Sequence, residues 1–437
     1  MKLTKEILKS NINRIREEIS HKKSEINIKN IIYDENTDEI WIITFDNPDK
    51  ATIIGKGGWV VGRLREELKI NKIHVISYSD YILKKYRMEL SLNKLNSFID
   101  SVKLNKNKNN KNNPKNTHDY SYNYNYSYNG LKNLKDLLKL KIDNIYNFNF
   151  NTFLNNNFNN NFLNNNSNNN SNIHDENINT NITNNAKITK NTKHEAIVAL
   201  SGGVDSSFSL ILAKYLGFNP IAITIDPGSI ILPKQFKNNI NNLTKELKVP
   251  HKYIEVDYTE IINESLKDGR YHPCGRCSSK TSETLFNYAI EHDINMIIFG
   301  DMIATGSQCL TKQYIDHENE KNKNNKENSN KKNNEKKNNE NNNENNSENK
   351  EIYEIYRLNL PASLSVGKQE IKEVISNYNI EKIVGFGCPL LGEVHKKYPY
   401  MRKFSIQRIL RETKSGALEV GEALDLIWSF NSSKFLK

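Results

Sequence analysis

Short hydrophobic blocks alternate with longer amphipathic segments through the C-terminal half of the chain. The blocks EAIVAL, PIAITID, HKYIEVD and NMIIFGD are rich in Val, Ile and Ala, as buried strands are. The segments between them, such as SSFSLILAKYLGF and SSKTSETLFNYAIEHD, place apolar residues at helical spacing. Short buried strands that alternate with helices build a parallel sheet covered on both faces. We therefore predict a doubly wound α/β domain over residues 193–437.

The N-terminal block, residues 1–104, follows a different order. Apolar residues at helical spacing predict a first helix, and the runs IKNIIYD and EIWIITF predict two strands joined by a turn. A short helix, the loop GKGG, a second helix WVVGRLREELKI and the strand KIHVIS follow, and a last amphipathic helix is predicted over residues 81–99. This block is predicted to be a small α+β domain.

Two low-complexity stretches interrupt this pattern. Residues 105–192 are dominated by Asn, and residues 316–350 by Asn, Lys and Glu. Such tracts bury too little apolar area to offset the entropy of ordering them, so we expect both to be disordered. The first is predicted to be a linker. The second is predicted to be an insertion within the α/β domain, because the strand-like EIYEIYRLNL after it resumes a pattern still incomplete at Leu310.

Composition excludes several classes of protein. A chain of 437 residues is too long for a single small binding module. It has no run of about 18–20 apolar residues and no apolar signal-peptide core, so we expect a cytoplasmic protein without a membrane partner. Four cysteines in so long a chain do not make a disulfide framework. The formal charge of +11 favours an anionic partner such as RNA.

The strongest chemical signal is the motif SGGVDS, residues 201–206, between a predicted buried strand and a helix. Its glycines let the backbone approach an oxyanion, while serine hydroxyls and the first amides of the helix donate hydrogen bonds to it. No lysine follows as in GxxxxGK[ST], so this is a different phosphate loop. An ordinary turn with a serine N-cap is the alternative, but the whole motif in this context favours a phosphate cradle.

A second signal is the pair Cys274 and Cys277, in the sequence CGRC before a helix. A CxxC turn brings two thiols to one centre, and we expect the helix N-terminus to lower their pKa. A structural zinc usually needs four ligands, and no second CxxC exists to complete such a site. Cys309 is predicted to be a buried thiol, whereas Cys388, among glycines and before a proline, is predicted to be exposed on a bent backbone.

The motif SGGVDS after AIVAL resembles the signature of the PP-loop ATP pyrophosphatases, a HUP-like superfamily of adenine-nucleotide α-hydrolases. The resemblance implies a domain that binds ATP with Mg²⁺, cleaves between the α and β phosphates and adenylates a carbonyl oxygen. It implies a pyrophosphate cradle made by Ser201, Gly202, Gly203, Asp205, Ser206 and Ser207. It also implies adenine near Thr224 and Ile225, and a ligand-binding strand end at Gly300 and Asp301. Asp301 is either a helix cap or a group that holds Mg²⁺.

A CxxC pair with one distant cysteine on such a domain is similar to the iron–sulfur-dependent tRNA thiolases. That resemblance implies a [4Fe-4S] cluster on Cys274, Cys277 and Cys388, with one iron left open for sulfur. Zinc on these thiols is the alternative cofactor. Persulfide chemistry, in which one cysteine carries sulfur and another releases it as a disulfide, is a further alternative. We assign catalytic roles to these three cysteines and to Asp205.

The loop Gly55-Lys56-Gly57-Gly58 lies between two predicted short helices in a βααβ pattern. The loop and its surroundings resemble the KH repeats of transcription elongation factors, which implies that it clamps the phosphates of single-stranded RNA. A glycine turn between two core helices is the alternative. Residues 395–408 form a basic segment with interleaved Tyr and Phe, which suits either an RNA backbone or a solvated helix face.

Together these signals favour an ATP-dependent sulfurtransferase that acts on tRNA, adenylates a pyrimidine carbonyl and replaces its oxygen with sulfur. Its expected partners are tRNA or another structured RNA and a sulfur donor, and a homodimer is left open. One rival is an ATP-dependent amide or amine transfer enzyme, which would not need the cysteines. The others are an RNA-binding protein that senses nucleotide without turnover and a zinc-stabilised scaffold.

Overall fold

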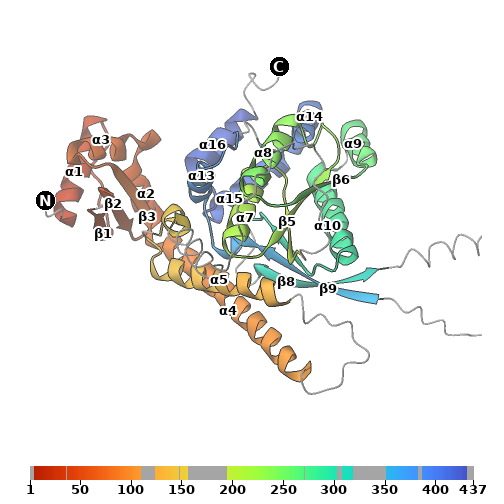
Figure 1. Cartoon of the computed structure of the whole chain (residues 1–437). Helices are drawn as coiled ribbons and strands as arrows, with labels where there is room; N and C mark the ends of the chain where they lie inside the picture. Colours follow the sequence, from red (N-terminus) through yellow and green to blue (C-terminus); the bar gives the residue numbers. More distant parts are fainter. Residues whose placement is uncertain are drawn as a thin grey trace, which may run out of the picture.

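The computed structural model contains an α/β part and a smaller N-terminal part, which a long helix joins (Figure 1). The structure describes residues 4–35, 37–109, 124–146, 148–155, 194–269, 271–302, 308–317, 351–381 and 386–430. Within these residues, no helix is both long and apolar enough to span a membrane.

The described residues of the α/β part build a six-stranded sheet with the strand order β6-β5-β4-β7-β9-β8. Its strands are β4 (Ala196–Ala199), β5 (Pro220–Asp226), β6 (His251–Glu255), β7 (Met296–Phe299), β8 (Leu310–His317) and β9 (Glu351–Asn359). Neighbouring strands are parallel, apart from β8, which pairs antiparallel with β9 at one edge. The predicted α/β fold with a parallel sheet is confirmed.

Helices cover both faces of this sheet because its strands are apolar on both sides. Ile197 and Ile297 belong to one buried cluster, and the next residues along the same strands, Val198 and Ile298, belong to the other. The two-residue period of a strand produces this alternation. The covering helices are α10 (Pro273–Glu291) on one face, and α7 (Val204–Tyr215), α8 (Lys234–Glu246) and α13 (Lys368–Ile375) on the other.

The order in which strands are added to the sheet reverses beside β4. The chain runs from β4 to β5 and β6 on one side, and then crosses to β7 and β9 on the other side. The carboxyl ends of β4 and β7 are therefore the switch point of the sheet, where open α/β sheets bind ligands. Leu200 follows β4 and Gly300 follows β7, so two of the predicted ligand segments begin at this point.

The N-terminal part shows the predicted order of elements. They are α1 (Lys5–Glu18), β1 (Ile28–Asp34), β2 (Glu39–Thr44), α2 (Asn47–Ile54), η1 (Lys56–Gly58), α3 (Trp59–Leu68) and β3 (Lys72–Ser77). Strand β1 is antiparallel to β2, and β2 is parallel to β3. Ile12 of α1, Ile42 of β2 and Leu64 of α3 are fully buried in one cluster, so both helices pack on this small sheet.

Helix α4 (Tyr78–Asn109) starts directly after β3 and extends beyond the predicted residues 81–99 at both ends. Helix α5 (Tyr124–Asp143) packs along it (Figure 1). Met88 and Leu95 of α4 are buried in the main core of the α/β part. One continuous helix therefore belongs to both parts of the molecule.

The prediction of a disordered linker is wrong for residues 130–146 and 148–155. Six apolar residues of this segment are buried in the main core of the α/β part: Leu131, Leu134, Leu137, Leu138, Phe150 and Leu154. At Gly130, a Cβ would lie 2.6 Å from the Phe218 ring, so α5 approaches the α/β part closely. The leucines recur at helical spacing, but the surrounding Asn residues conceal the stripe. Of the rest of the predicted linker, residues 105–109 end α4 and residues 124–129 begin α5, whereas residues 110–123, 147 and 156–192 lie outside the described residues.

Strands β8 and β9 pair as a hairpin until His317 lies opposite Glu351. The predicted insertion thus departs from and returns to the end of one hairpin, and residues 318–350 lie outside the described residues. The remaining elements are α9 (Thr259–Asn263), η3 (Glu264–Asp268), α12 (Leu360–Ser363), α14 (Pro389–Lys397), η6 (Pro399–Met401), α15 (Arg402–Lys414) and α16 (Val420–Ser429).

Truncation of one α5 leucine tests whether this helix belongs to the core. Leu137 is 1% exposed, and Leu140 on the same helix is 43% exposed. Leu137→Ala should lower the free energy of unfolding by about 2–5 kcal/mol, because it removes buried methyl groups and leaves a cavity. Leu140→Ala should change it by less than about 0.5 kcal/mol. Urea denaturation measures the free energy of unfolding of both variants. Equal values for Leu137→Ala and Leu140→Ala would contradict the packing of α5.

Candidate functional site

The loop between β4 and α7 carries the SGGVDS motif at the switch point. Gly202 has a φ of +76°, which favours glycine, and a Cβ there would lie 2.7 Å from the Phe236 carbonyl oxygen. The Ser206 hydroxyl accepts a hydrogen bond from Ser201 N (3.2 Å) and donates one to the Gly203 carbonyl oxygen (3.0 Å). The loop is thus held in one shape before the first turn of α7, whose free amides and dipole favour an anion.

The end of β7 contacts this loop at Gly300. A Cβ on Gly300 would lie 2.8 Å from Ser206 N and 2.9 Å from the Asp205 carbonyl carbon. The Ser209 hydroxyl lies within hydrogen-bond distance of the carbonyl oxygens of Asp205 (3.0 Å) and Phe299 (3.3 Å). The end of β7 and the first turn of α7 are therefore in backbone contact, which leaves no room for a side chain.

Lys368 is a site residue that the sequence patterns did not reveal. Its Nζ lies 2.7 Å from both carboxylate oxygens of Asp205. The two residues are 163 positions apart, so no local motif could pair them. Lys368 is the first residue of α13, where the helix dipole disfavours a positive charge. A lysine at such a position is a weak sign of an acidic partner.

Two other predicted ligand residues have buried side chains. Ser207 is 1% exposed, and its hydroxyl has no hydrogen-bond partner within the described residues. The Thr224 hydroxyl is fully buried, 2.7 Å from the Leu200 carbonyl oxygen and 2.9 Å from His251 Nε2. Ile225, the next residue, is half-buried. The Thr224 side chain therefore supports the sheet, and Ile225 is better placed to meet a base.

Asp301 is exposed and forms an ion pair. Its Oδ2 lies 2.6 Å from Nη2 of Arg357, whose guanidinium stacks 3.9 Å above the Phe299 ring. The carboxylate already has a cationic partner, so Mg²⁺ would compete with this arginine.

Two helix starts bring three cysteines close enough for their charges to interact. Cys274 and Cys277 lie in the first turns of α10, and Cys388 is the N-cap of α14. Burial, followed by the neighbouring thiols, raises the pKa of Cys277 to about 12. Burial and Cys388 also raise the pKa of Cys274, although Arg408 and backbone hydrogen bonds oppose this. The expectation that a helix N-terminus lowers these pKa values is wrong, because burial outweighs the helix amides.

Two histidines and a serine connect the segments that carry these cysteines. The Ser405 hydroxyl lies 3.1 Å from His395 Nε2 on α14 and 3.5 Å from Nε2 of His272, the N-cap of α10. Burial, together with the charges of His272 and Arg402, lowers the pKa of His395 to about 4. His395 is therefore neutral at physiological pH and suited to a structural hydrogen bond.

The ligands available at these helix starts are three thiols. Among the described residues, no three His, Cys, Asp or Glu side chains surround one point as the ligands of a single metal ion would. The fourth cysteine, Cys309, is buried in the main core as predicted, so four thiols do not meet. The ligands of an iron–sulfur cluster bind different irons and stand farther apart. Three thiols fit a cluster better than a structural zinc.

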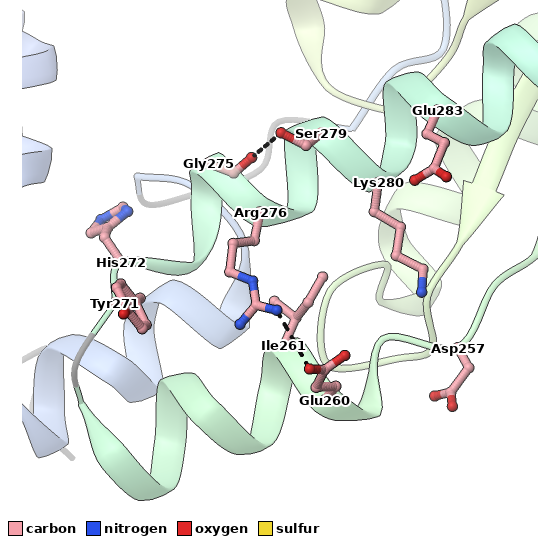
Figure 2. Close-up of a pocket in the computed structure, with 10 residues that line it drawn as sticks. All are labelled: Asp257, Glu260, Ile261, Tyr271, His272, Gly275, Arg276, Ser279, Lys280 and Glu283. Carbon is pink, nitrogen blue, oxygen red and sulfur yellow. Dashed lines mark hydrogen bonds and ion pairs between the residues drawn. The ribbon is translucent and has the colours of Figure 1, made fainter. Parts of the chain in front are cut away.

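A pocket adjoins the CxxC turn on the outer side of α10. It has a volume of about 420 Å³ and is lined by Asp257, Glu260, Ile261, Tyr271, His272, Gly275, Arg276, Ser279, Lys280 and Glu283. In Figure 2, the Arg276 side chain points towards Glu260, with which it forms an ion pair. The lining charges largely balance each other, so the pocket favours no single class of ion.

Arg408 links the cysteine site to the phosphate loop electrostatically. Its Nε lies 3.0 Å from Glu412 Oε1. Burial lowers the pKa of Arg408, but the charges of Glu412, Cys274 and Asp205 outweigh burial. The net effect is a raised pKa. The arginine is therefore close enough to interact with both Cys274 and Asp205. Other parts of the basic C-terminal segment are structural, since the Tyr398 hydroxyl donates to the Leu266 and Lys267 carbonyl oxygens.

The GKGG loop of the N-terminal part joins α2 to α3. Gly55, Gly57 and Gly58 have φ values of +71°, +62° and +77°. A Cβ at Gly57 or Gly58 would meet no atom within 4 Å, so the backbone is open to a partner there. The Lys56 side chain is exposed, and Trp59 is 42% exposed. The loop presents backbone amides and a cation at the surface.

The strand order and the position of the loop define the class of protein, a doubly wound α/β protein with the SGGVDS loop at the switch point of its sheet. The chain belongs to the family of a Methanocaldococcus jannaschii protein described as "Uncharacterized protein MJ1638". The two are 30% identical over 228 residues, which are 52% of this chain and 71% of that relative. No family model matches the chain.

Two enzymes are similar over a shorter stretch. The tRNA-specific 2-thiouridylases MnmA of Lactobacillus gasseri and Lactobacillus johnsonii are 26% and 27% identical over 129 residues, which are 26% of this chain. The match spans 34% of each enzyme, about a third of its length. Among solved structures, the U34-tRNA thiolase NcsA from Methanococcus maripaludis with its [4Fe-4S] cluster is 14% identical. The alignment covers 55% of this chain and 72% of the thiolase chain, at a TM-score of 0.30.

A methyl group at Gly300 tests the backbone contact that shapes the phosphate loop. Gly300→Ala should weaken ATP binding about tenfold or more, because the added Cβ displaces the loop at an overpacking cost of about 1–3 kcal/mol. Gly421→Ala, where a Cβ meets nothing within 4 Å, is the matched control. Equilibrium ATP binding and thermal melting are measured together. Wild-type affinity in a folded Gly300→Ala protein would contradict a nucleotide site at this loop.

Proposed function

We propose that this chain is an ATP-dependent sulfurtransferase that acts on tRNA. The observation that carries the proposal is the meeting of a phosphate cradle and three cysteines at one end of the sheet. Arg408 interacts with Asp205 of the cradle and with Cys274, and the Leu390 amide of α14 donates to the Ile230 carbonyl oxygen in the loop after β5 (2.9 Å). The partial similarity to two tRNA-specific 2-thiouridylases supports the same class of reaction.

In the proposed reaction, the cradle residues Ser201, Gly202, Gly203, Asp205 and Ser206 hold the β and γ phosphates of ATP, with Mg²⁺. The C2 or C4 carbonyl oxygen of a pyrimidine attacks the α phosphorus, and pyrophosphate leaves. Sulfide-level sulfur (HS⁻) from the sulfur donor then bonds to the ring carbon, the carbon–oxygen bond breaks, and AMP leaves with the original oxygen. Lys368 and Arg408 stand where negative charge gathers, so they would stabilise it without rearrangement.

Cys274, Cys277 and Cys388 would hold the sulfur-handling centre. A [4Fe-4S] cluster on these three thiols would supply the chemistry that binds sulfur and passes it on. Bound metal would also offset the repulsion between the three thiolates, which burial makes unfavourable without a cation. The hydrogen bonds of Ser405 to His272 and His395 would fix the separation of the two segments that carry these thiols.

The N-terminal part, residues 1–104, would act as a KH-like module that binds the tRNA. The parallel pair β2 and β3 flanks two helices joined by the exposed GKGG loop, as this role requires. Open backbone at Gly57 and Gly58 would admit phosphates, and Lys56 would neutralise them. The α/β part, residues 193–437, would carry out the chemistry.

Thionucleoside analysis of tRNA tests the activity, and metal analysis tests its centre. Protein purified without oxygen should be brown and contain iron, and both properties should be lost in Cys274→Ala and Cys388→Ala. Cys309→Ala is the matched control, because that thiol lies in the main core and should leave the iron in place. Deletion of the protein should remove a thionucleoside from tRNA, and complementation with Cys388→Ala should not restore it.

Other outcomes would separate the rival functions. Unchanged thionucleosides after deletion would refute the proposal. Stoichiometric zinc, or metal that does not depend on Cys388, would favour persulfide chemistry or a structural site. Full ATP turnover by Cys274→Ala would favour amide or amine transfer. Release of AMP and pyrophosphate stimulated by tRNA would exclude a nucleotide sensor without turnover.

Loss of one charge in the GKGG loop tests the RNA-binding role. Lys56→Gln should weaken tRNA binding by roughly three- to tenfold at low salt, because one phosphate contact is lost, and should lower the salt dependence by about one charge. Lys69→Gln removes the same charge at the far end of α3 and should have little effect. Filter binding over a salt series measures both, and equal effects would indicate non-specific charge rather than a phosphate clamp.

A further inference from the structure

A buried lysine of α5 has no role in the chemistry described so far. Lys141 is 3% exposed, and its Nζ lies 2.5 Å from Glu370 Oε1 on α13. The rings of Phe148 and Phe150 lie 5.6 Å and 4.6 Å from the same nitrogen. The lysine is enclosed by one carboxylate and two aromatic rings.

Burial of this lysine is unfavourable in itself. Burial lowers the pKa of Lys141 to about 8, even though the charge of Glu370 raises it. Burial raises the pKa of Glu370, but the charges of Lys141 and Lys84 outweigh this and lower it to about 2. The two groups therefore form an ion pair at neutral pH. Apolar residues of similar size often stabilise a protein as well as a buried ion pair does, so stability alone does not account for this pair.

Glu370 fixes the beginning of α13. Its Oε2 accepts a hydrogen bond from Gly367 N (2.8 Å) as the acidic member of a capping box. The same oxygen lies 3.4 Å from Nζ of Lys84, which belongs to α4. Lysines from α4 and α5 thus hold one carboxylate, and that carboxylate holds the first turn of α13.

The residue within that turn is Lys368, the partner of Asp205 in the phosphate loop. Its backbone N also donates to the Ala417 carbonyl oxygen (2.9 Å), so both ends of the residue are held. A shift of the first turn of α13 would move the Lys368 charge relative to the loop. The position of this charge therefore depends on Glu370 and on the lysines that hold it.

We propose that Lys141 is a positioning residue of the nucleotide site. Through Glu370 and the first turn of α13, it places the Lys368 charge beside Asp205, where the pyrophosphate of ATP would bind. The Asn-rich segment thus contributes to the site through α5. This inference rests on the proposed binding of ATP at the SGGVDS loop.

A double-mutant cycle tests this dependence. Lys141→Met should weaken ATP binding about tenfold, and Lys141→Arg, which keeps the charge, should restore most of the affinity. In a Lys368→Met background, Lys141→Met should have no further effect on affinity, because it acts through Lys368. The expected coupling is about 1.4 kcal/mol, the equivalent of tenfold. Lys139→Met, at an exposed position of α5, is the matched control.

The measurements are the dissociation constant of ATP and the urea midpoint of each variant. Equal affinity in wild type and folded Lys141→Met would overturn this inference alone. Additive losses in the double variant would also overturn it, since they would indicate general destabilisation. Absence of ATP binding by the wild-type protein would overturn the nucleotide site itself. Should Lys141→Met fail to fold, Glu370→Gln in the presence and absence of Lys368→Met gives the same cycle.

Discussion

The site depends on the contact between two backbones at the switch point of the sheet. Gly300 and the first turn of α7 approach so closely that a single methyl group would lie 2.8 Å from Ser206 N. This contact holds the backbone from which the Asp205 side chain projects. Lys368 pairs with Asp205, and Arg408 lies near enough to interact with it. Backbone packing therefore places the acidic partner of both cations.

Both halves of the site favour positive charge in their surroundings. The phosphate loop offers helix amides and the nearby cations Lys368 and Arg408, which suit an anion. The cysteine centre gathers three groups that repel one another once ionised, and burial adds to this cost. The positive charge of Arg408 opposes this effect at Cys274. Arg408 can serve both halves because it lies near Asp205 and Cys274.

The sequence predicted the elements whose patterns are local and missed those that depend on distant contacts. Alternating Val and Ile blocks fix the strands of a parallel sheet, so the fold class followed from them. The leucine stripe of α5 was missed because Asn dominates the composition around it, although Leu131, Leu134 and Leu138 recur at helical spacing. Local composition describes what surrounds a helix, whereas its buried face is decided by a few positions.

The same distinction holds within the site. The SGGVDS and CGRC motifs are contiguous, so their residues could be named from the sequence. Lys368 and Arg408 could not, because each gains its role from partners far along the chain. The expected lowering of the cysteine pKa values also failed for this reason. The helix N-terminus is a local feature, but the burial that outweighs it arises only in the folded chain, and the neighbouring residues do not predict it.

Helix α4 makes the N-terminal part and the α/β part mechanically continuous. It begins directly after the last residue of β3, contributes Lys84 to the Glu370 cluster, and donates a hydrogen bond from Arg87 to the Ser415 carbonyl oxygen. Ser415 precedes Ala417, which holds the backbone of Lys368. An RNA clamped at the GKGG loop would thus stand at a set distance from the nucleotide site. If the proposed RNA binding holds, such an arrangement would select a base by its separation from the clamped strand and would need few contacts with the base itself.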